Sequence, residues 1–131
     1  MNVLPLRLKP NQDLKLSLQE IATIEQIQAG FILTAVGSLQ QAKLRFAGQD
    51  ESVCLSGRFE IVSLVGTLSR EGIHLHIALA DHQGKTIGGH LQTGCIIYTT
   101  AEIVIGIVPG YIFRRTPDTE TGYLELEINP L

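Results

Sequence analysis

The sequence predicts an α+β domain, in which one long N-terminal helix packs on a curved, mostly antiparallel β-sheet of about seven to eight strands. Two observations lead to this fold class. A single segment, beginning after Asp13, repeats its apolar residues at helical spacing. From Phe31 onward the apolar residues follow strand periodicity, with short connections. Helices and strands do not alternate along the chain, which argues against a parallel, doubly wound sheet.

The N-terminal third contains the predicted helix. Residues 3–8 alternate loosely and predict a strand that ends at Pro10. Asp13 is the expected N-cap, because its side chain can accept from the free backbone N–H groups of the first turn. Gly30 is the expected end of the helix. The apolar face of the helix consists of Leu14, Leu18, Ile21 and Ile24.

The remainder of the chain predicts strands. Most of these segments are rich in β-branched residues, which favour pleated surfaces. Polar, glycine-containing turns separate them, including one around Gly48 and one at Pro109 and Gly110. The predicted strand segments are 31–38, 42–47, 58–68, 73–80, 86–91, 95–99, 103–108, 111–115 and 123–128.

Length and composition limit the classes of protein that fit. The 131 residues suit one domain over residues 1–131, with one hydrophobic core. Charged residues make up 18%, below the usual quarter, which favours a surface partly covered by self-association. The net charge of −3 gives no whole-chain attraction to nucleic acid. No run of about eighteen apolar residues indicates a membrane span.

The N-terminus and the cysteines predict a cytoplasmic protein. The N-terminus shows no secretory signal pattern. Cys54 and Cys95 fit neither a metal-site spacing nor a disulfide framework, and both are expected to be reduced and semi-buried.

Three of the four histidines fall in one predicted hairpin, residues 73–91. His74 and His76 are two residues apart, so on a strand they share a face. The opposite face carries the aliphatic residues expected in the core: Ile73, Leu75, Ile77 and Leu79. Only the small Ala78 and Ala80 accompany the histidines, which leaves room for a cavity, a ligand or a partner.

The turn of this hairpin sets which residues face each other. If the turn is centred near His82 or Gln83, His76 lies opposite Gly89 or His90. Directly opposed residues have Cβ atoms about 4.5–5.5 Å apart. His82 itself lies in the turn and is expected to be exposed to solvent.

The hairpin therefore predicts a metal site formed by His74, His76 and His90. Three imidazoles can bind one divalent ion, zinc in the simplest case, through nitrogen at roughly 2.0–2.1 Å, with a fourth position open. The alternative is that the three side chains are half-buried polar groups hydrogen-bonded to backbone or to a neighbouring subunit.

A catalytic role would need a carboxylate beside the histidines. A zinc ion lowers the pKa of its bound water to about 7, but hydrolysis also calls for a base. Asp81 follows the aliphatic side of its strand and is expected to point away. Glu60 and Glu102 lie on other strands and are the candidate nearby carboxylates.

A second candidate site is an interaction surface. Arg58 and Glu60 share one face of a strand, and Gly88 and Gly89 permit a close backbone approach. The alternative for the charged pair is a solvated ion pair worth well under about 1 kcal/mol. The one basic doublet, residues 114–115, is too small for a nucleic-acid footprint.

Several short motifs, in order along nearly the whole chain, resemble those of the plant and prokaryote conserved (PPC) domain. They are GSL at 37–39, GRFEI at 57–61, HLHIALAD at 74–81, GGH at 88–90, TTAEIVI at 99–105 and TGY at 121–123. The resemblance implies an α+β subunit that forms a homotrimer, with a functional surface near the subunit contacts. It also implies metal at His74, His76 and His90. Plant members carry an AT-hook, but this sequence has no Arg-Gly-Arg-Pro hook for the minor groove.

Three functional hypotheses follow. The first is a non-enzymatic, trimeric binding or interaction module that carries the three-histidine metal site and that can also recognise a partner protein. The second is a metal-dependent hydrolase acting on a small molecule. The third is a DNA-binding regulatory protein, which the acidic charge and the missing hook disfavour.

Overall fold

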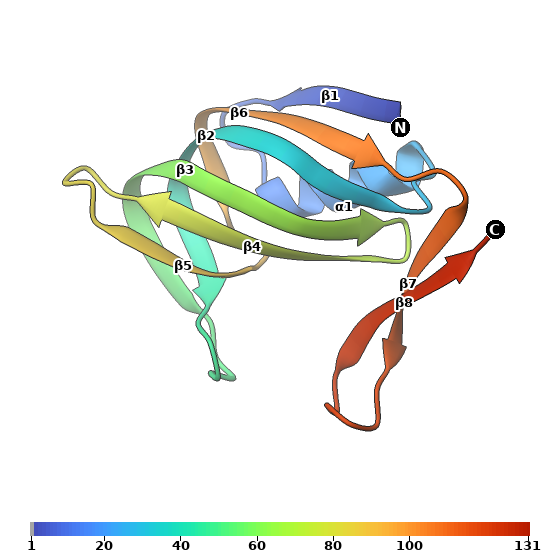
Figure 1. The fold of residues 1–131 in the computed structure, drawn as a ribbon. Helices are drawn as coiled ribbons and strands as arrows, with labels where there is room; N and C mark the ends of the chain where they lie inside the picture. The colour runs from blue at the N-terminus through green and yellow to red at the C-terminus, as the bar shows by residue number, and fades with distance from the viewer. Residues whose placement is uncertain (1) are drawn as a thin grey trace.

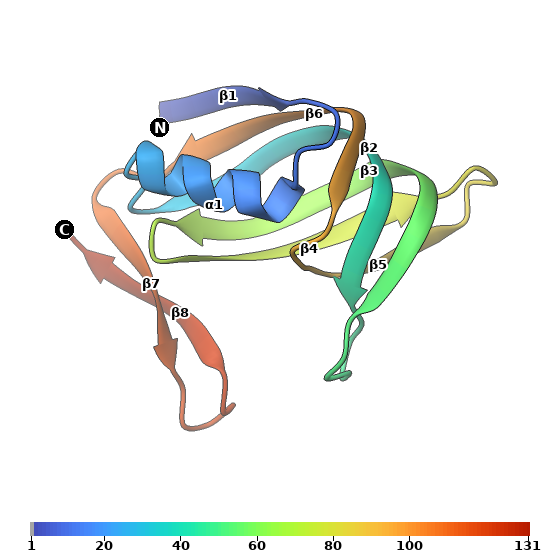
Figure 2. The ribbon, with the colours of Figure 1, turned by 180° about the vertical axis from the view of Figure 1, so that it is seen from behind.

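The structure is a computed structural model that describes residues 2–131 and consists of two antiparallel sheets and one helix (Figure 1). The large sheet has six strands in the order β1-β6-β2-β3-β4-β5, and the small sheet is the β7–β8 hairpin. The helix α1 lies across one face of the large sheet (Figure 2). In chain order the elements are β1 (Asn2–Leu8), α1 (Leu14–Ile24), β2 (Gly30–Arg45), β3 (Val53–Ser69), β4 (Gly72–Ala80), β5 (Thr86–Leu91), β6 (Ile96–Ile107), β7 (Tyr111–Pro117) and β8 (Leu124–Pro130).

The predicted α+β fold, with its mostly antiparallel strands and single helix, is confirmed, but the helix is not long. It has eleven residues and begins, as predicted, after the N-cap Asp13, which accepts a hydrogen bond from the backbone N–H of Leu16 at 3.0 Å. Gly30 does not end it. Gln26 takes a left-handed φ of 53°, and the next residue, Ile27, donates its N–H to the Ala22 carbonyl. The helix thus closes in a Schellman motif four residues earlier than a glycine-based rule predicts.

Two pairs of predicted strand segments are joined into single long strands. Segment 31–38 and most of segment 42–47 lie in β2, and most of segments 95–99 and 103–108 lie in β6. The pairing between β2 and β6 shifts register at three places but continues across them. Such bulges bend a strand without ending it, whereas in the sequence they interrupt the alternation and look like breaks.

The curvature of the large sheet brings its far strands together. The end of β2 pairs with β5, where Leu44 lies opposite Leu91 and Arg45 lies opposite His90. The strands from β2 to β5 therefore close partly on themselves. This closure places the last histidine of the predicted cluster beside an arginine from a distant part of the chain.

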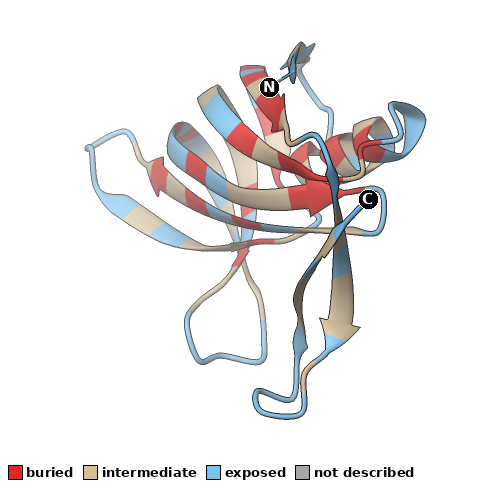
Figure 3. Cartoon of the chain, turned by 45° about the vertical axis from the view of Figure 1, so that its right-hand side comes forward, coloured by how far each residue is buried: buried red, intermediate tan, exposed pale blue. Residues whose placement is uncertain are grey.

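The core lies between α1 and the inner face of the large sheet. Leu75, Ile77 and Leu79 of β4 face the core, as the alternation predicts. Figure 3 shows buried residues alternating with less buried ones along strands of the large sheet. Each fully buried side chain of this size contributes about 1.5–3 kcal/mol. Cys95 is fully buried whereas Cys54 is exposed, so the two cysteines do not share the expected semi-buried setting. The largest fully buried side chains are Leu14, Leu18, Ile27, Leu39, Leu44, Leu68, Leu79, Ile97, Ile103, Ile105 and Cys95.

The β7–β8 hairpin projects away from the large sheet (Figure 1). Its base is fixed by Phe113, whose N–H donates to the Gln28 carbonyl at 2.9 Å and whose carbonyl accepts from the Ser69 hydroxyl at 2.7 Å. Arg114 also forms a salt bridge with Glu71 at 3.1 Å. The hairpin is thereby held against the ends of β3 and β4. No helix in the described residues is long and apolar enough to cross a membrane.

Candidate metal centre

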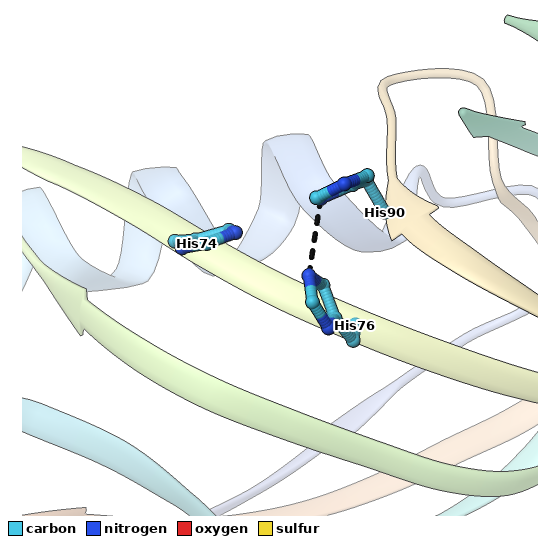
Figure 4. A group of neighbouring side chains, drawn as sticks. All are labelled: His74, His76 and His90. Carbon is cyan, nitrogen blue, oxygen red and sulfur yellow. Dashed lines mark hydrogen bonds between the residues drawn. The ribbon is translucent and has the colours of Figure 1, made fainter. Parts of the chain in front are cut away.

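The three histidines of the predicted hairpin meet on the outer face of β4 and β5 (Figure 4). His76 and His90 are directly opposed across the two strands, which is one of the two registers that the sequence predicts. His74 lies two residues away on the same face. One ring nitrogen from each of the three residues lies within 4.8 Å of the other two.

The rings are packed against one another rather than turned apart. The ring centroids of His76 and His90 are 4.5 Å apart in an edge-to-face arrangement, and His74 and His90 are stacked at 5.7 Å with 13° between their planes. The Nε2 atom of His76 lies 3.1 Å from Nδ1 of His90. A hydrogen bond at this distance requires a proton on one of the two nitrogens and a lone pair on the other.

This nitrogen geometry fits a transition-metal ion. In a tetrahedral site with metal–nitrogen bonds of 2.0–2.1 Å, the ligand nitrogens lie roughly 3.3 Å from one another. The distance of 3.1 Å between the His76 and His90 nitrogens is close to that value, and one nitrogen of His74 lies within 4.8 Å of both residues. Imidazole donors suit zinc, copper, iron and nickel. Because the group supplies three ligands, one tetrahedral position is left for another molecule.

The surroundings of the cluster favour the neutral imidazoles of His74 and His90. Burial lowers the pKa of His74, and the positive charge of Arg115 lowers it further. Burial likewise lowers the pKa of His90, with Arg45 as the second cause. A metal ion binds the unprotonated nitrogen, so both shifts keep the ligands available for metal at lower pH.

Local sequence features hold the histidine strands in place. The turn between β4 and β5 is fixed by Asp81, whose Oδ1 accepts from the N–H groups of Gln83 and Lys85, both at 2.9 Å. These backbone hydrogen bonds also lower the pKa of the Asp81 carboxyl. On the neighbouring strand, Gly66 has a φ of 138°, and a Cβ there would lie 2.1 Å from the His74 carbonyl oxygen. Only glycine allows β3 to approach the histidine strand this closely.

The two glycines predicted for the interaction surface have a similar packing role. A Cβ on Gly88 would lie 2.9 Å from the Ile77 carbonyl oxygen, and one on Gly89 would lie 2.9 Å from that of Arg45. Both therefore let β5 fit closely against β4 and β2. This close fit positions His90 next to His76.

Two cavities open beside the cluster. One has a volume of about 430 Å³ and is lined by His74 and His76, and the other, of about 860 Å³, is lined by His74 and His90. Arg115 and Glu125, from the β7–β8 hairpin, line both cavities. These volumes are in the range of small-molecule sites. The histidine cluster thus lies where two potential ligand spaces meet.

The candidate carboxylates named from the sequence lie elsewhere. Glu60 lines a third cavity of about 560 Å³, together with His82 of the turn, which is exposed as predicted. Glu102 lies opposite Arg7 of β1 and accepts a hydrogen bond from the Thr100 hydroxyl at 3.3 Å. Neither carboxylate lines the two cavities beside the histidines.

Glu125 is the carboxylate that the structure brings to the cluster, and sequence reasoning missed it. It partly offsets the other effects on His74 by raising the pKa of that residue. The alternation of residues 123–128 identifies Glu125 as one of the two acidic residues on a strand. No local pattern in the sequence indicates that this strand, in a separate sheet, brings Glu125 to the cavities beside His74.

Arg58 and Glu60, the charged pair of the predicted interaction surface, are both exposed on β3. The Arg58 guanidinium lies over the ring of Tyr98, 4.1 Å from its centroid, and within residues 2–131 no salt bridge joins Arg58 to Glu60. An exposed cation–π contact of this kind contributes about 0.5–1 kcal/mol.

Comparison with known families agrees with the fold and motifs. The model of the Plants and Prokaryotes Conserved (PCC) domain matches residues 1–109. This chain belongs to that family. The matched region contains all of the large sheet and the three clustered histidines. The family is the one that the sequence motifs indicate, under the abbreviation PPC.

Two solved structures are similar to this PPC chain over nearly all of its length. A hypothetical protein from Salmonella cholerae-suis is 41% identical, with a TM-score of 0.96, and the match covers 98% of this chain and 94% of that one. A metal-containing protein from Archaeoglobus fulgidus is 27% identical, with a TM-score of 0.82, and the match covers 97% of this chain and 94% of that one.

A curated relative places the same kind of domain in a much longer protein. The bifunctional protein GlmU of Synechococcus sp. strain JA-3-3Ab is 57% identical over 128 residues, which are 98% of this chain. The PPC chain spans only about a fifth (21%) of the length of that relative.

Proposed function

We propose that this PPC chain is a non-enzymatic, homotrimeric binding module whose residues His74, His76 and His90 hold a divalent metal ion, with zinc as the first candidate. The observation that carries the proposal is the convergence of three ring nitrogens within 4.8 Å of one another. The metal-containing nature of the Archaeoglobus relative supports it. When bound, such an ion supplies a Lewis acid with an open coordination position.

The exposed apolar residues support assembly into a trimer. The projecting hairpin leaves Tyr123, Leu124 and Ile128 each more than half exposed, and Val62 and Val65 of β3 are also more than half exposed. Exposed apolar side chains of this kind can be covered by a contact between subunits. Closed symmetry would repeat the metal site once in each subunit.

The GlmU relative supports a role as one domain among others. In that Synechococcus protein, the region similar to this chain is a minor part of a longer polypeptide that is named as bifunctional. We propose that this PPC chain acts as a ligand-binding domain that can be joined to other protein domains.

A second candidate function is a metal-dependent hydrolase, and the position of Glu125 favours it. This carboxylate lines both cavities next to His74, so it could accept a proton from a water molecule in either. Ester, phosphate and amide substrates should be tested with the wild type and with His76→Ala. Turnover that the substitution leaves unchanged, or no turnover, would count against this candidate.

DNA binding is the third candidate, and the charge of the chain disfavours it. A net charge of −3 provides little attraction to phosphate. A gel-shift assay at low salt, where such binding is strongest, would reveal any affinity.

The metal proposal is tested on untagged protein that has been dialysed against zinc and then washed. Elemental analysis should find about one zinc per chain in the wild type and in the control variant His82→Ala, but much less in His76→Ala. Less than about a tenth of an equivalent in the wild type would refute the metal site. Light scattering on the same sample should give three times the chain mass of 14.3 kDa, and a monomer would refute the trimer.

A further inference from the structure

Two arginines from distant parts of the chain flank the histidine cluster. Arg115 of β7 lines both cavities, and its Nη2 donates to the Thr67 hydroxyl at 2.7 Å. Thr67 lies directly opposite His74 on the neighbouring strand. The guanidinium is therefore held beside the first histidine.

The stem of this arginine is also positioned by its neighbours. It passes over Gly72, where a Cβ would lie 3.1 Å from the Arg115 Cγ. Burial lowers the pKa of Arg115, although its side chain remains charged at neutral pH, and Glu125 offsets part of that shift. A half-buried, hydrogen-bonded guanidinium loses little freedom when it binds a ligand.

The second arginine approaches the cluster from the other side. Arg45 is paired directly with His90 and lines the larger cavity. Its Nη1 donates to the Gln49 carbonyl at 3.1 Å. The positive charge of Arg115 contributes to the lowered pKa of His74, and that of Arg45 contributes to the lowered pKa of His90. Each arginine therefore lies near a different histidine.

The charged side chains around the larger cavity are equal in number before any metal is added. Three basic side chains face three acidic ones, and one of the acids is already paired with Arg114. Neutral imidazoles leave the full double charge on a bound divalent ion, so the loaded site has an excess of positive charge. The residues in this balance are Lys15, Arg45 and Arg115 against Asp50, Glu71 and Glu125.

We infer that the histidine cluster, together with Arg115 and Arg45, binds an oxyanion group, a carboxylate or a phosphate, carried by a small molecule. This inference rests on the proposed metal site and names the class of ligand for it. Guanidinium groups match the spacing of two oxygens in such anions and bind them with two hydrogen bonds. The adjoining cavities, of about 430 and 860 Å³, accommodate the remainder of the molecule.

Glu125 opposes the bound anion. It lines both cavities, so its negative charge acts against any oxyanion placed beside Arg115. The carboxylate weakens binding of every anion, and its removal should strengthen it. A merely structural role for Arg115 and Glu125 predicts no such opposite effects.

The test is calorimetric titration of zinc-loaded protein with inorganic phosphate and, separately, with acetate. For at least one probe, Arg115→Gln should weaken binding about tenfold or more, because it removes a charge-assisted hydrogen-bond donor. Glu125→Gln should tighten binding, and Thr67→Val should weaken it a few-fold. Arg58→Gln, which alters an exposed arginine at the third cavity, should leave binding unchanged.

Zinc content separates this inference from the metal proposal. If the variants load zinc like the wild type but Arg115→Gln binds both probes as well as the wild type does, the inference is overturned and the metal site stands. If the wild type takes up no zinc, the metal proposal fails and the inference fails with it. Arg115→Lys, which keeps the charge, should restore part of the affinity and so excludes simple misfolding as the cause.

Discussion

Removal of one histidine should weaken zinc binding by about the share of the binding free energy that one ligand contributes. Four-ligand structural sites bind zinc with about 10–16 kcal/mol, which is roughly 2.5–4 kcal/mol per ligand if the energy is shared equally. His90→Ala deletes one of the three ligands and leaves the other two on β4. Because 1.4 kcal/mol corresponds to a factor of ten, the zinc Kd should rise about 60- to 700-fold.

The weaker zinc affinity of His90→Ala should also reduce the rise in Tm that zinc produces. Zinc at a hundred times its Kd stabilises the folded protein by about 2.7 kcal/mol. For a chain of 131 residues this raises the Tm by roughly 10 °C. If the Kd rises a hundredfold, the same zinc concentration stabilises His90→Ala by only about 0.4 kcal/mol, and the Tm shift falls to roughly 1–2 °C.

The assay combines competition against a chromophoric chelator with thermal unfolding in the presence and absence of zinc. His82→Ala is the matched control, because that histidine lies in the exposed turn of the same hairpin and outside the cluster. It should keep the wild-type Kd and the full Tm shift. A Kd for His90→Ala within threefold of the wild type would refute the three-ligand site, as would an equal loss in both variants.

Three further predictions concern stability. Folding lowers the pKa of His74 and His90, so the unfolded chain binds more protons below about pH 6.5. The zinc-free protein should therefore lose stability as the pH falls through that region, and less so in a His74→Gln variant. Urea midpoints between about pH 5 and 8 in the presence of a chelator check this, and midpoints that rise in acid would contradict it. Gly66→Ala should lower the free energy of unfolding by at least about 2 kcal/mol, because of left-handed backbone strain and a clash with the His74 carbonyl. A loss below about 1 kcal/mol in urea titrations would contradict the requirement for glycine at this position. Asp13→Ala removes the acceptor for the helix N-cap and for the Gly94 N–H at 2.7 Å, so it should cost roughly 1–3 kcal/mol, with Asp13→Asn recovering part of it. Equal unfolding midpoints for Asp13→Ala and the wild type would count against the cap.

The histidine hairpin could be predicted because its information is local. The alternation of β4 assigns His74 and His76 to one face, and the composition of the turn limits the register to two choices. The structure takes the choice that sets His76 opposite His90. A one-residue difference would have moved every side chain of β5 to the other face, so the short turn fixed by Asp81 decides the geometry.

The end of the helix and the long strands could not be predicted, because they depend on exceptions to sequence rules. Gln26 takes the left-handed position where glycine is usual, and tertiary packing of Ile27, which is almost fully buried, stabilises that choice. Bulges in β2 shift the alternation of its residues without ending the pairing. Both features appear in the sequence only as weak or broken patterns.

Two charged residues beside the histidines come from a part of the chain that is distant in sequence. The candidate centre therefore has two parts, the histidines and these charged residues. All three histidines lie within residues 1–109, which the family model matches, whereas Arg115 and Glu125 lie beyond that region on the β7–β8 hairpin. The residues of the proposed metal site thus lie in the region that the family model matches, and the charged residues of the proposed ligand site lie in the hairpin that follows it. We therefore expect substitutions in that hairpin to alter the proposed ligand preference while leaving the histidine strands in place, since its salt bridge and hydrogen bonds fix it to the ends of β3 and β4 and to the segment after α1.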